Sequence, residues 1–344
     1  MKEKSIPVSG FLFLLVIFPV AAMQGLFDRH VPLNVEVSVS LQRLKETKSD
    51  TLFAESWFRY MDSNGSWDSV AVQIRARGNS RRSICYFPPM RLKFKKKSAN
   101  GTLFGGNESL KLVIPCQESS AYQSFVSKEF LAYKFYEQLS PYHFKTRKVN
   151  LTLVDERDRK NKTHQLTAFL LEDPDFVAKR FAGKISQAKL VMPHVLDDTT
   201  ALIQDFFAFM IGNTDWSNTS QHNVKVMELK GGKNIPLPYD FDMAGLVNAP
   251  YAKPYDYLPI SSVQERLYQG ICREPALVQY VKNLFLMKES DFRSILKSSG
   301  EDLAAADFRT MNQYLDGFFE VIRDDRRFKA EILDKCVPMP QGRK

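Results

Sequence analysis

The sequence predicts an α+β fold with a β-rich N-terminal part and a mainly helical C-terminal part. Before about residue 172, apolar and polar residues alternate in several short stretches, which is the period of a strand. Over residues 263–333 the apolar residues recur with the period of a helix. The 344 residues allow one large domain or two lobes around one cleft, and 44% hydrophobic with 25% charged residues is typical of globular proteins.

The N-terminus has the features of a secretory signal peptide. Lys2 and Lys4 precede an apolar run over residues 11–22, and Val20 and Ala22 are small residues at the −3 and −1 positions of a cleavage site. A helix over this run would reach about 18 Å, which is too short for a bilayer core of about 30 Å. The alternative is an uncleaved membrane anchor. We expect a signal peptide over 1–22, a β-rich lobe with one long helix over 23–172, and a helical lobe over 173–344.

Export determines how the four cysteines are interpreted. No pair has the C-x-x-C spacing of a zinc or redox site. In a periplasmic or extracellular location, an even number of cysteines predicts two disulfides. Three pairings are possible, and the simplest one joins Cys85 to Cys116 and Cys272 to Cys336, each within one lobe.

The net charge of +9 attracts anions such as nucleotides, nucleic acid, lipid headgroups or acidic proteins. The basic runs over residues 81–82 and 95–97 lack the interleaved aromatic residues of a nucleic-acid groove. We therefore expect most of this charge to form a solvated face, with no nucleic-acid partner and no stable membrane span after signal cleavage.

The β-rich part contains two candidate anion-binding features. Arg77 and Asn79 flank Gly78 directly after a predicted strand, in a turn that permits a positive φ, although an ordinary surface turn is the alternative. Lys93 faces away from the apolar residues of the next strand, where it is either a phosphate anchor or part of a solvated basic face. Glu129 lies among the aromatic residues of the first long helix and needs a partner if it is buried, for which Lys93 is the candidate; the alternative is an exposed Glu129.

The predicted elements follow the chain in this order. Strands are expected at 34–41, 51–60, 70–74, 90–95, 109–114, 149–154, 165–171, 224–229 and 235–239, and helices at 122–139, 174–181, 198–211 and over 263–333.

Two acidic clusters flank the predicted hairpin of the C-terminal part. Asp215 lies in a polar loop that ends at Asn223, where a strand begins. Residues 230–234 form the turn, and the return strand delivers Asp240 and Asp242 beside the first loop. An Asp, an Asn eight residues on, a hairpin and an Asp near a Gly follow the order of protein-kinase phosphoryl-transfer sites. The alternative is a polar hairpin with ordinary turn residues.

A resemblance to the CotH kinase-like family of spore-coat and secreted atypical kinases rests on RARGNSRRSICYFPPMRLKFKK, SKEFLAYKFYEQL, GNTDWSNTSQHN and PYDFDMAG. These stretches span about residues 75–245. The resemblance implies a two-lobed kinase-like fold, ATP, Mg²⁺ or Mn²⁺, and phosphorylation of protein hydroxyls. This chain departs from the family pattern in reading Asp-Trp-Ser-Asn where an Asp-Arg spelling is usual.

The resemblance also assigns roles to residues. It makes Asp215 the catalytic residue, Asn223 and Asp240 the metal ligands, and Lys93 with Glu129 the nucleotide-anchoring pair. From its place two residues after Asp240, we expect Asp242 to share the ion or to support it.

Three functions fit these patterns. The first is an exported kinase that transfers a phosphoryl group from ATP to a protein hydroxyl. The second is a non-catalytic binding or structural protein of the envelope or surface on the same scaffold. The third is a nucleotidyl transferase. Three Asp residues and an Asn follow the order in which metal-binding residues occur in kinases. They favour catalysis, because a binding protein has no need of them.

Signal cleavage predicts that the exported protein begins at Met23. Mass spectrometry of the secreted or periplasmic chain tests this. A chain that retains Met1 and stays in the membrane fraction would contradict the assignment.

Overall fold

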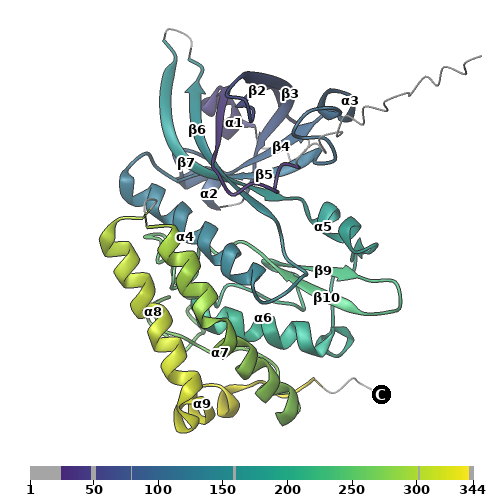
Figure 1. Cartoon of the computed structure of the whole chain (residues 1–344), viewed down its shortest axis with the longest axis vertical. Coiled ribbons are helices and arrows are strands. Elements are labelled where there is room, and N and C mark those ends of the chain that lie inside the picture. The colour runs from purple at the N-terminus through teal and green to yellow at the C-terminus, as the bar shows by residue number, and fades with distance from the viewer. Residues whose placement is uncertain (1–24, 48–51, 79, 158–159, 301–302, 341–344) are drawn as a thin grey trace, which may run out of the picture.

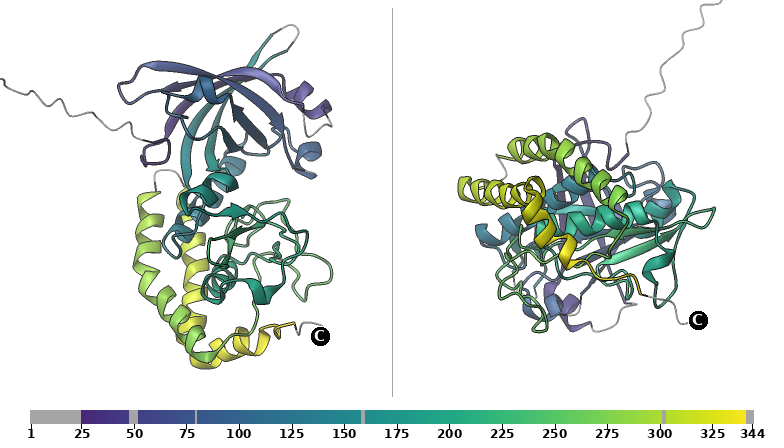
Figure 2. Two further views of the ribbon diagram at one scale, coloured as in Figure 1. Left: turned by 90° about the vertical axis from the view of Figure 1, so that its right-hand side faces the viewer. Right: turned by 90° about the horizontal axis from the view of Figure 1, so that it is seen from below.

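The computed structural model describes residues 25–47, 52–78, 80–157, 160–300 and 303–340. The predicted signal peptide lies outside these residues. A β-rich part lies at the top of Figure 1, with most of the helices below it, and the side view in Figure 2 shows the same division. The prediction of a β-rich N-terminal region followed by a helical C-terminal part is confirmed.

Seven strands in the described part of the chain close into a mixed barrel in the order β1-β2-β3-β4-β5-β7-β6. Alternate side chains point inward, so that Val35 and Val37 of β1 meet Phe58 of β2 in one apolar core. The strands are β1 (Leu33–Val39), β2 (Ala54–Met61), β3 (Trp67–Ala76), β4 (Met90–Phe94), β5 (Ser109–Val113), β6 (Thr146–Asp155) and β7 (Lys162–Glu172).

The predicted two-lobed kinase-like fold is wrong, because a closed barrel is not the bilobed kinase fold. Closure depends on β1, which pairs antiparallel with β2 and also parallel with β6. The parallel pair sets Val35 opposite Leu151. Apolar alternation identifies each strand but contains no information about a partner so far away in the sequence.

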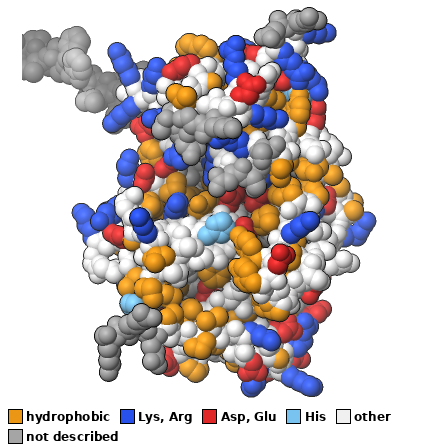
Figure 3. All heavy atoms as spheres, turned by 180° about the vertical axis from the view of Figure 1, so that it is seen from behind, with side chains coloured by type: hydrophobic (Ala, Val, Ile, Leu, Met, Phe, Trp, Pro, Cys, Tyr) orange, Lys and Arg blue, Asp and Glu red, His pale blue; other side chains and the backbone are white. Residues whose placement is uncertain are grey.

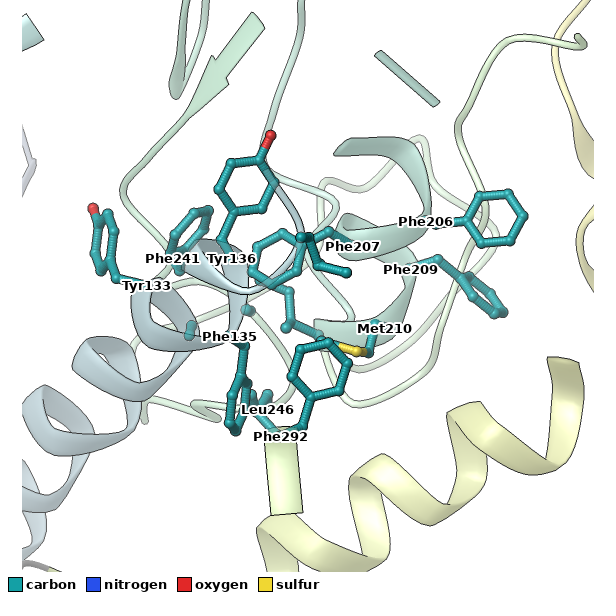
Figure 4. Close-up of a cluster of buried hydrophobic side chains, with 14 of the residues drawn as sticks. Tyr133, Phe135, Tyr136, Phe206, Phe207, Phe209, Met210, Phe241, Leu246 and Phe292 are labelled. Carbon is teal, nitrogen blue, oxygen red and sulfur yellow. The ribbon is translucent and has the colours of Figure 1, made fainter. Parts of the chain in front are cut away.

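The helical part is built around α6 (Asp198–Ile211), which is buried on nearly all sides. The side chain of Asp197 accepts a hydrogen bond from the Thr200 N–H and caps the start of the helix. Gly212 ends it in the left-handed region, with φ +64°. Aromatic side chains of α6 and α4 (Ser120–Glu137) meet in the core drawn in Figure 4.

The remaining elements surround these two parts. They are α1 (Leu41–Glu46), α2 (Ser80–Ile84), α3 (Lys96–Ala99), α5 (Pro174–Arg180), β8 (Lys184–Ile185), η1 (Pro193–Val195), β9 (Val224–Glu228), β10 (Asn234–Pro238), α7 (Pro275–Ser298), α8 (Ala305–Arg323), α9 (Asp325–Glu331) and η2 (Leu333–Lys335).

The helical run expected over residues 263–333 begins only at Pro275, the first residue of α7. The segment before α7 is held in an irregular path by tertiary contacts. The Arg266 guanidinium lies 3.8 Å from the centre of the Tyr314 ring and donates to the carbonyl oxygen of Met210. Periodicity alone misses such contacts, because they depend on residues distant in sequence.

Phe241 anchors the loop that follows β10. Its ring is fully buried, with ring centres 4.6 Å from Tyr133 of α4 and 5.4 Å from Phe207 of α6 (Figure 4). The residues on either side of Phe241 are therefore held in place by the core.

The predicted cysteine pairing is confirmed, since Cys85 bonds to Cys116 and Cys272 to Cys336. The first bond ties the end of α2 to the segment after β5, and the second ties the segment before α7 to the end of η2. None of the helices in the described ranges is long and apolar enough to cross a membrane.

Replacing the Phe241 ring tests its anchoring role. Phe241→Ala should lower the free energy of unfolding by about 3–5 kcal/mol, because it removes a fully buried ring and leaves a cavity. Tyr280→Ala is the matched control, since Tyr280 is 56% exposed on α7, and should change stability by less than about 0.5 kcal/mol. Urea denaturation measures both, and equal effects of the two substitutions would contradict the anchoring role.

Candidate functional site

The hairpin of β9 and β10 brings the two acidic clusters to one end of a small sheet. Val224 pairs with Pro238, and the Tyr239 N–H donates to the carbonyl oxygen of Asn223 over 3.0 Å. Asn223, which precedes β9, therefore lies beside the segment that carries Asp240. The turn at the other end uses Gly231 and Gly232 at φ +102° and +89°, as the predicted turn requires.

Asp215 is positioned by residues on three segments. His222 Nε2 lies 2.8 Å from Asp215 Oδ1, and Asn223 Nδ2 donates to Asp215 Oδ2 over 2.9 Å. The Tyr255 hydroxyl donates to Oδ1 over 2.8 Å, and this hydrogen bond raises the pKa of Tyr255 to about 12. The Asp215 N–H donates to Asn213 Oδ1, which fixes the loop. These donors hold a partly exposed carboxylate in one orientation.

Two ion pairs join the segment after β10 to the β-rich part. Lys111 Nζ lies 2.7 Å from Asp240 Oδ1, and Arg81 Nη1 lies 2.8 Å from Asp242 Oδ2. Lys111 belongs to β5 and Arg81 to α2, so each pair links a basic residue of the β-rich region to an acidic residue of the helical part. Phe241, between the two acidic residues, is buried in the core. Both pairs are thus fixed by the same anchored tripeptide.

Asp240 is held in an uncommon backbone conformation. Its φ is +65°, in the left-handed region that disfavours residues with a Cβ. Its N–H donates to the Tyr133 hydroxyl over 2.8 Å. Burial alone would raise the pKa of Asp240, but Lys111, Arg77 and Arg81 outweigh burial and hold that pKa well below its usual range. The surroundings therefore stabilise a charged carboxylate at this point of the chain.

Glu129 completes the charged cluster from α4. It is 2% exposed, and its Oε1 atom has no hydrogen-bond partner among the described residues. Burial, followed by the charge of Asp242, raises the pKa of Glu129 to about 8 despite Lys111 and Arg81. The raised pKa favours the protonated form of Glu129 over a pH range in which an exposed glutamate is ionised. Arg77 adds a positive charge close to Asp240 and Lys111.

The structure does not bring Lys93 to Glu129. Leu92 and Phe94 point into the barrel, so Lys93 points outward, where it is exposed and lies 5.9 Å from the Phe53 ring. Lys111, on the next strand of the barrel, is the lysine that lies near Glu129, where Lys93 was expected. Its neighbours Leu110 and Leu112 face the barrel core, so Lys111 faces the helical part.

Of the predicted anion-binding loop over residues 77–79, the structure describes Arg77 and Gly78. Gly78 has φ +81°, as the predicted turn requires, and Arg77 contributes charge to the cluster. Asn79 lies outside the described residues. Sequence reasoning missed Arg81 and Lys111, which are basic residues whose burial only the fold reveals, and His222 and Tyr255, which contact Asp215. The lysine within the apolar strand Ser109–Val113 is the one signal that could have been used.

A metal ion at this site would need oxygen atoms from a bound molecule in addition to those of the protein. The described residues contain no group of three or more His, Cys, Asp or Glu side chains that could hold a metal ion. One oxygen of Asp240 bonds to Lys111, and Asp242 is engaged by Arg81 and by the Tyr251 hydroxyl. Asn223 donates its amide nitrogen to Asp215. Such a set fits Mg²⁺ or Mn²⁺ held by one or two carboxylates together with phosphate oxygens, not an ion in an all-protein cage.

Hydrophobic and charged side chains are interspersed over the face opposite to that of Figure 1 (Figure 3). No protein-family model matches the chain, and no curated protein matches it. The resemblance to the CotH kinase-like family therefore stays a prediction.

The raised pKa of Glu129 predicts a pH dependence of stability. A carboxyl whose pKa rises from 4.5 to about 8 on folding contributes stability that is complete below 4.5 and is lost as the pH rises toward 8. Glu129→Gln cannot ionise, so its stability relative to wild type should increase over that interval. Urea denaturation across this pH range measures the difference.

The exposed residue Glu320 supplies the control, and Glu320→Gln should follow the wild-type slope. Parallel curves for wild type and Glu129→Gln would show that Glu129 is ionised throughout.

Proposed function

We propose that this chain is an exported phosphotransferase that moves the γ-phosphoryl group of ATP to a protein hydroxyl with Mg²⁺ or Mn²⁺. One observation carries the proposal. A single hairpin sets Asp215 and Asn223 beside Asp240, and Asp240 is in turn paired with Lys111 at 2.7 Å. Phosphoryl transfer requires this combination of an acceptor-side carboxylate, a ligand-side carboxylate and a phosphate-binding cation.

The basic residues around Asp240 support binding of the phosphates. Lys111, Arg81 and Arg77 all act electrostatically on Asp240, so their charges converge on one small region. A phosphate chain bound there would be stabilised by cations that the fold has already oriented, which avoids the cost of ordering them during the reaction.

Asp240 and Asn223 are the residues that would hold the metal, with Asp242 keeping Arg81 in place behind them. The bound ion would supply neutralisation of charge on the phosphate oxygens. Asn223 also hydrogen-bonds to Asp215, so one side chain couples the acceptor side of the site to the metal side.

Asp215 is the residue that would accept the proton. The Tyr255 hydroxyl now donates to its Oδ1 atom, and an acceptor hydroxyl would take the place of that donor. As the acceptor oxygen bonds to the γ-phosphorus, its proton moves to Asp215. The bond between that phosphorus and the β–γ bridging oxygen breaks with its electron pair, and ADP leaves.

One observation favours a second candidate. The pairs Lys111–Asp240 and Arg81–Asp242 satisfy each other's charges without any ligand, as they would in a non-catalytic binding or structural protein. A nucleotidyl transferase would use the same groups but cleave at the α-phosphorus. The position of a radioactive label on ATP separates these three functions.

Two substitutions test the assignment of roles. Asp240→Asn should weaken Mn²⁺-dependent ATP binding by at least about tenfold, because it removes a metal ligand and the partner of Lys111. Asp215→Asn should leave that binding intact and lower transfer by about 10²–10⁴-fold, because it removes the base and leaves Asp240 and Lys111 unchanged. Calorimetry and incubation with γ- or α-labelled ATP measure the two effects.

Asp256→Asn is the matched control, since Asp256 is exposed in the same loop as Tyr255 and should change neither quantity. Equal ATP binding by wild type and Asp240→Asn would contradict the metal-site assignment and favour the binding protein. Transfer of label only from the α-position would favour the nucleotidyl transferase.

A further inference from the structure

A cavity lies beside the Asp215 loop. It has a volume of about 410 Å³, which is within the range of about 300–1,000 Å³ that small ligands or side chains occupy in proteins. Residues 216–219, directly after Asp215, form one wall, and Ala201 of α6 lies in another. Leu258, Ile271 and Val337 make much of the remaining wall apolar.

Several polar atoms of this cavity are buried without a hydrogen-bond partner among the described residues. They are Trp216 Nε1, Gln269 Oε1 and Arg273 Nη1. Arg273 is 4% exposed and forms an ion pair through its Nε atom with Asp198, which leaves Nη1 as a further donor. Buried donors and acceptors normally find a partner, so this group of two donors and one acceptor points to a ligand that supplies the complementary atoms.

The cavity and Asp215 are connected by two ordered segments. The first is the loop after Asp215, in which Gln204 of α6 donates to Asn218 over 3.0 Å and thereby holds the wall in place. The second carries Tyr255, whose hydroxyl reaches Asp215, and Leu258, which lines the cavity. The cavity therefore adjoins the two segments that carry Asp215 and Tyr255.

The chemistry of the walls favours a neutral polypeptide over a free anion. Arg273 already forms an ion pair with Asp198 at 2.9 Å, so its charge is compensated and an added carboxylate would find no unpaired cation there. An extended peptide presents carbonyl oxygens for donors and an N–H for an acceptor, and its side chain can fill an apolar space.

We propose that this cavity binds an apolar side chain of the acceptor polypeptide next to the hydroxyl held at Asp215. Its backbone carbonyls accept from Trp216 Nε1 and Arg273 Nη1, and a backbone N–H donates to Gln269 Oε1. This inference rests on the proposed function only in treating the bound polypeptide as the acceptor. Binding of the peptide can be measured without any transfer.

Trp216 supplies a direct readout of binding. The chain has three tryptophans, and the other two, Trp57 and Trp67, are 62% and 45% exposed on the barrel. In a Trp57→Phe/Trp67→Phe background, emission comes from Trp216 alone. The probes are short N-acetylated, C-amidated peptides with a central serine and either Leu or Asp at each flanking position in turn.

We expect a saturable change in Trp216 emission for peptides with Leu at one particular position. The Asp peptide at that position should bind at least about tenfold more weakly, because it places a charge in an apolar space. Leu258→Asp should remove the preference for Leu. The matched control is Leu52→Asp, a change at an exposed leucine on the barrel, which should keep the preference.

A second variant distinguishes a change in the cavity from a distortion of the loop by Leu258→Asp. Ala201→Met places a larger side chain in the wall that α6 contributes to the cavity, and it should also remove the preference for Leu while ATP binding persists. Incubation of the same peptides with γ-labelled ATP completes the test.

The outcomes separate the inference from the proposed function. Leu-dependent binding without phosphorylation would support the peptide site and overturn the phosphotransferase. Phosphorylation without any preference for Leu, or a preference that survives both Leu258→Asp and Ala201→Met, would overturn the cavity assignment and leave the phosphotransferase standing. Absence of peptide binding at every position would overturn the inference.

Discussion

The structure depends on a pair of ionic contacts that cross from the β-rich part to the helical part. Asp240 and Asp242 lie in a loop of the helical part, and their partners Lys111 and Arg81 come from β5 and α2. A charge removed from water is stable only beside a compensating charge, so neither side can be buried without the other. The orientation of the two parts is therefore coupled to the charge state of this cluster.

The same contacts limit what the cluster can bind. A phosphate group or a metal ion would have to compete with an existing ion pair, so that one partner of Asp240 is exchanged for another. Such an exchange is favourable only if the ligand brings both an anion for Lys111 and a cation for the carboxylate. A nucleotide with its divalent ion meets this requirement, whereas a bare metal ion or inorganic phosphate does so only in part. Selectivity for a nucleotide bound to its metal ion would follow from the existing ion pair between Lys111 and Asp240.

Local patterns in the sequence predicted local features of the fold. Alternation at Val35 and Val37 identified β1, Gly231 and Gly232 marked the hairpin turn, and the cysteine pairing followed from position in the chain. Closure of the barrel could not be predicted, because it rests on a parallel pairing of β1 with the distant β6. The sequence analysis predicted Glu129 in the site but assigned Lys93 as its neighbour. Lys93 and Lys111 both alternate with apolar residues, so the local pattern does not distinguish them. Only the strand order shows that Lys111 faces the helices.

The bond between Cys85 and Cys116 has a consequence for the entropy of forming the cluster. Lys111 lies within the loop that this bond closes between cysteines 31 positions apart, and Arg81 lies just before it. In an unfolded chain with the bond intact, these two cations cannot separate as far as they could in an open chain, so less conformational entropy is lost when both are brought to the acidic loop. A reduced chain would have to gather the same charges from a larger ensemble, and oxidation of the two cysteines would therefore lower the entropic barrier to assembling the site.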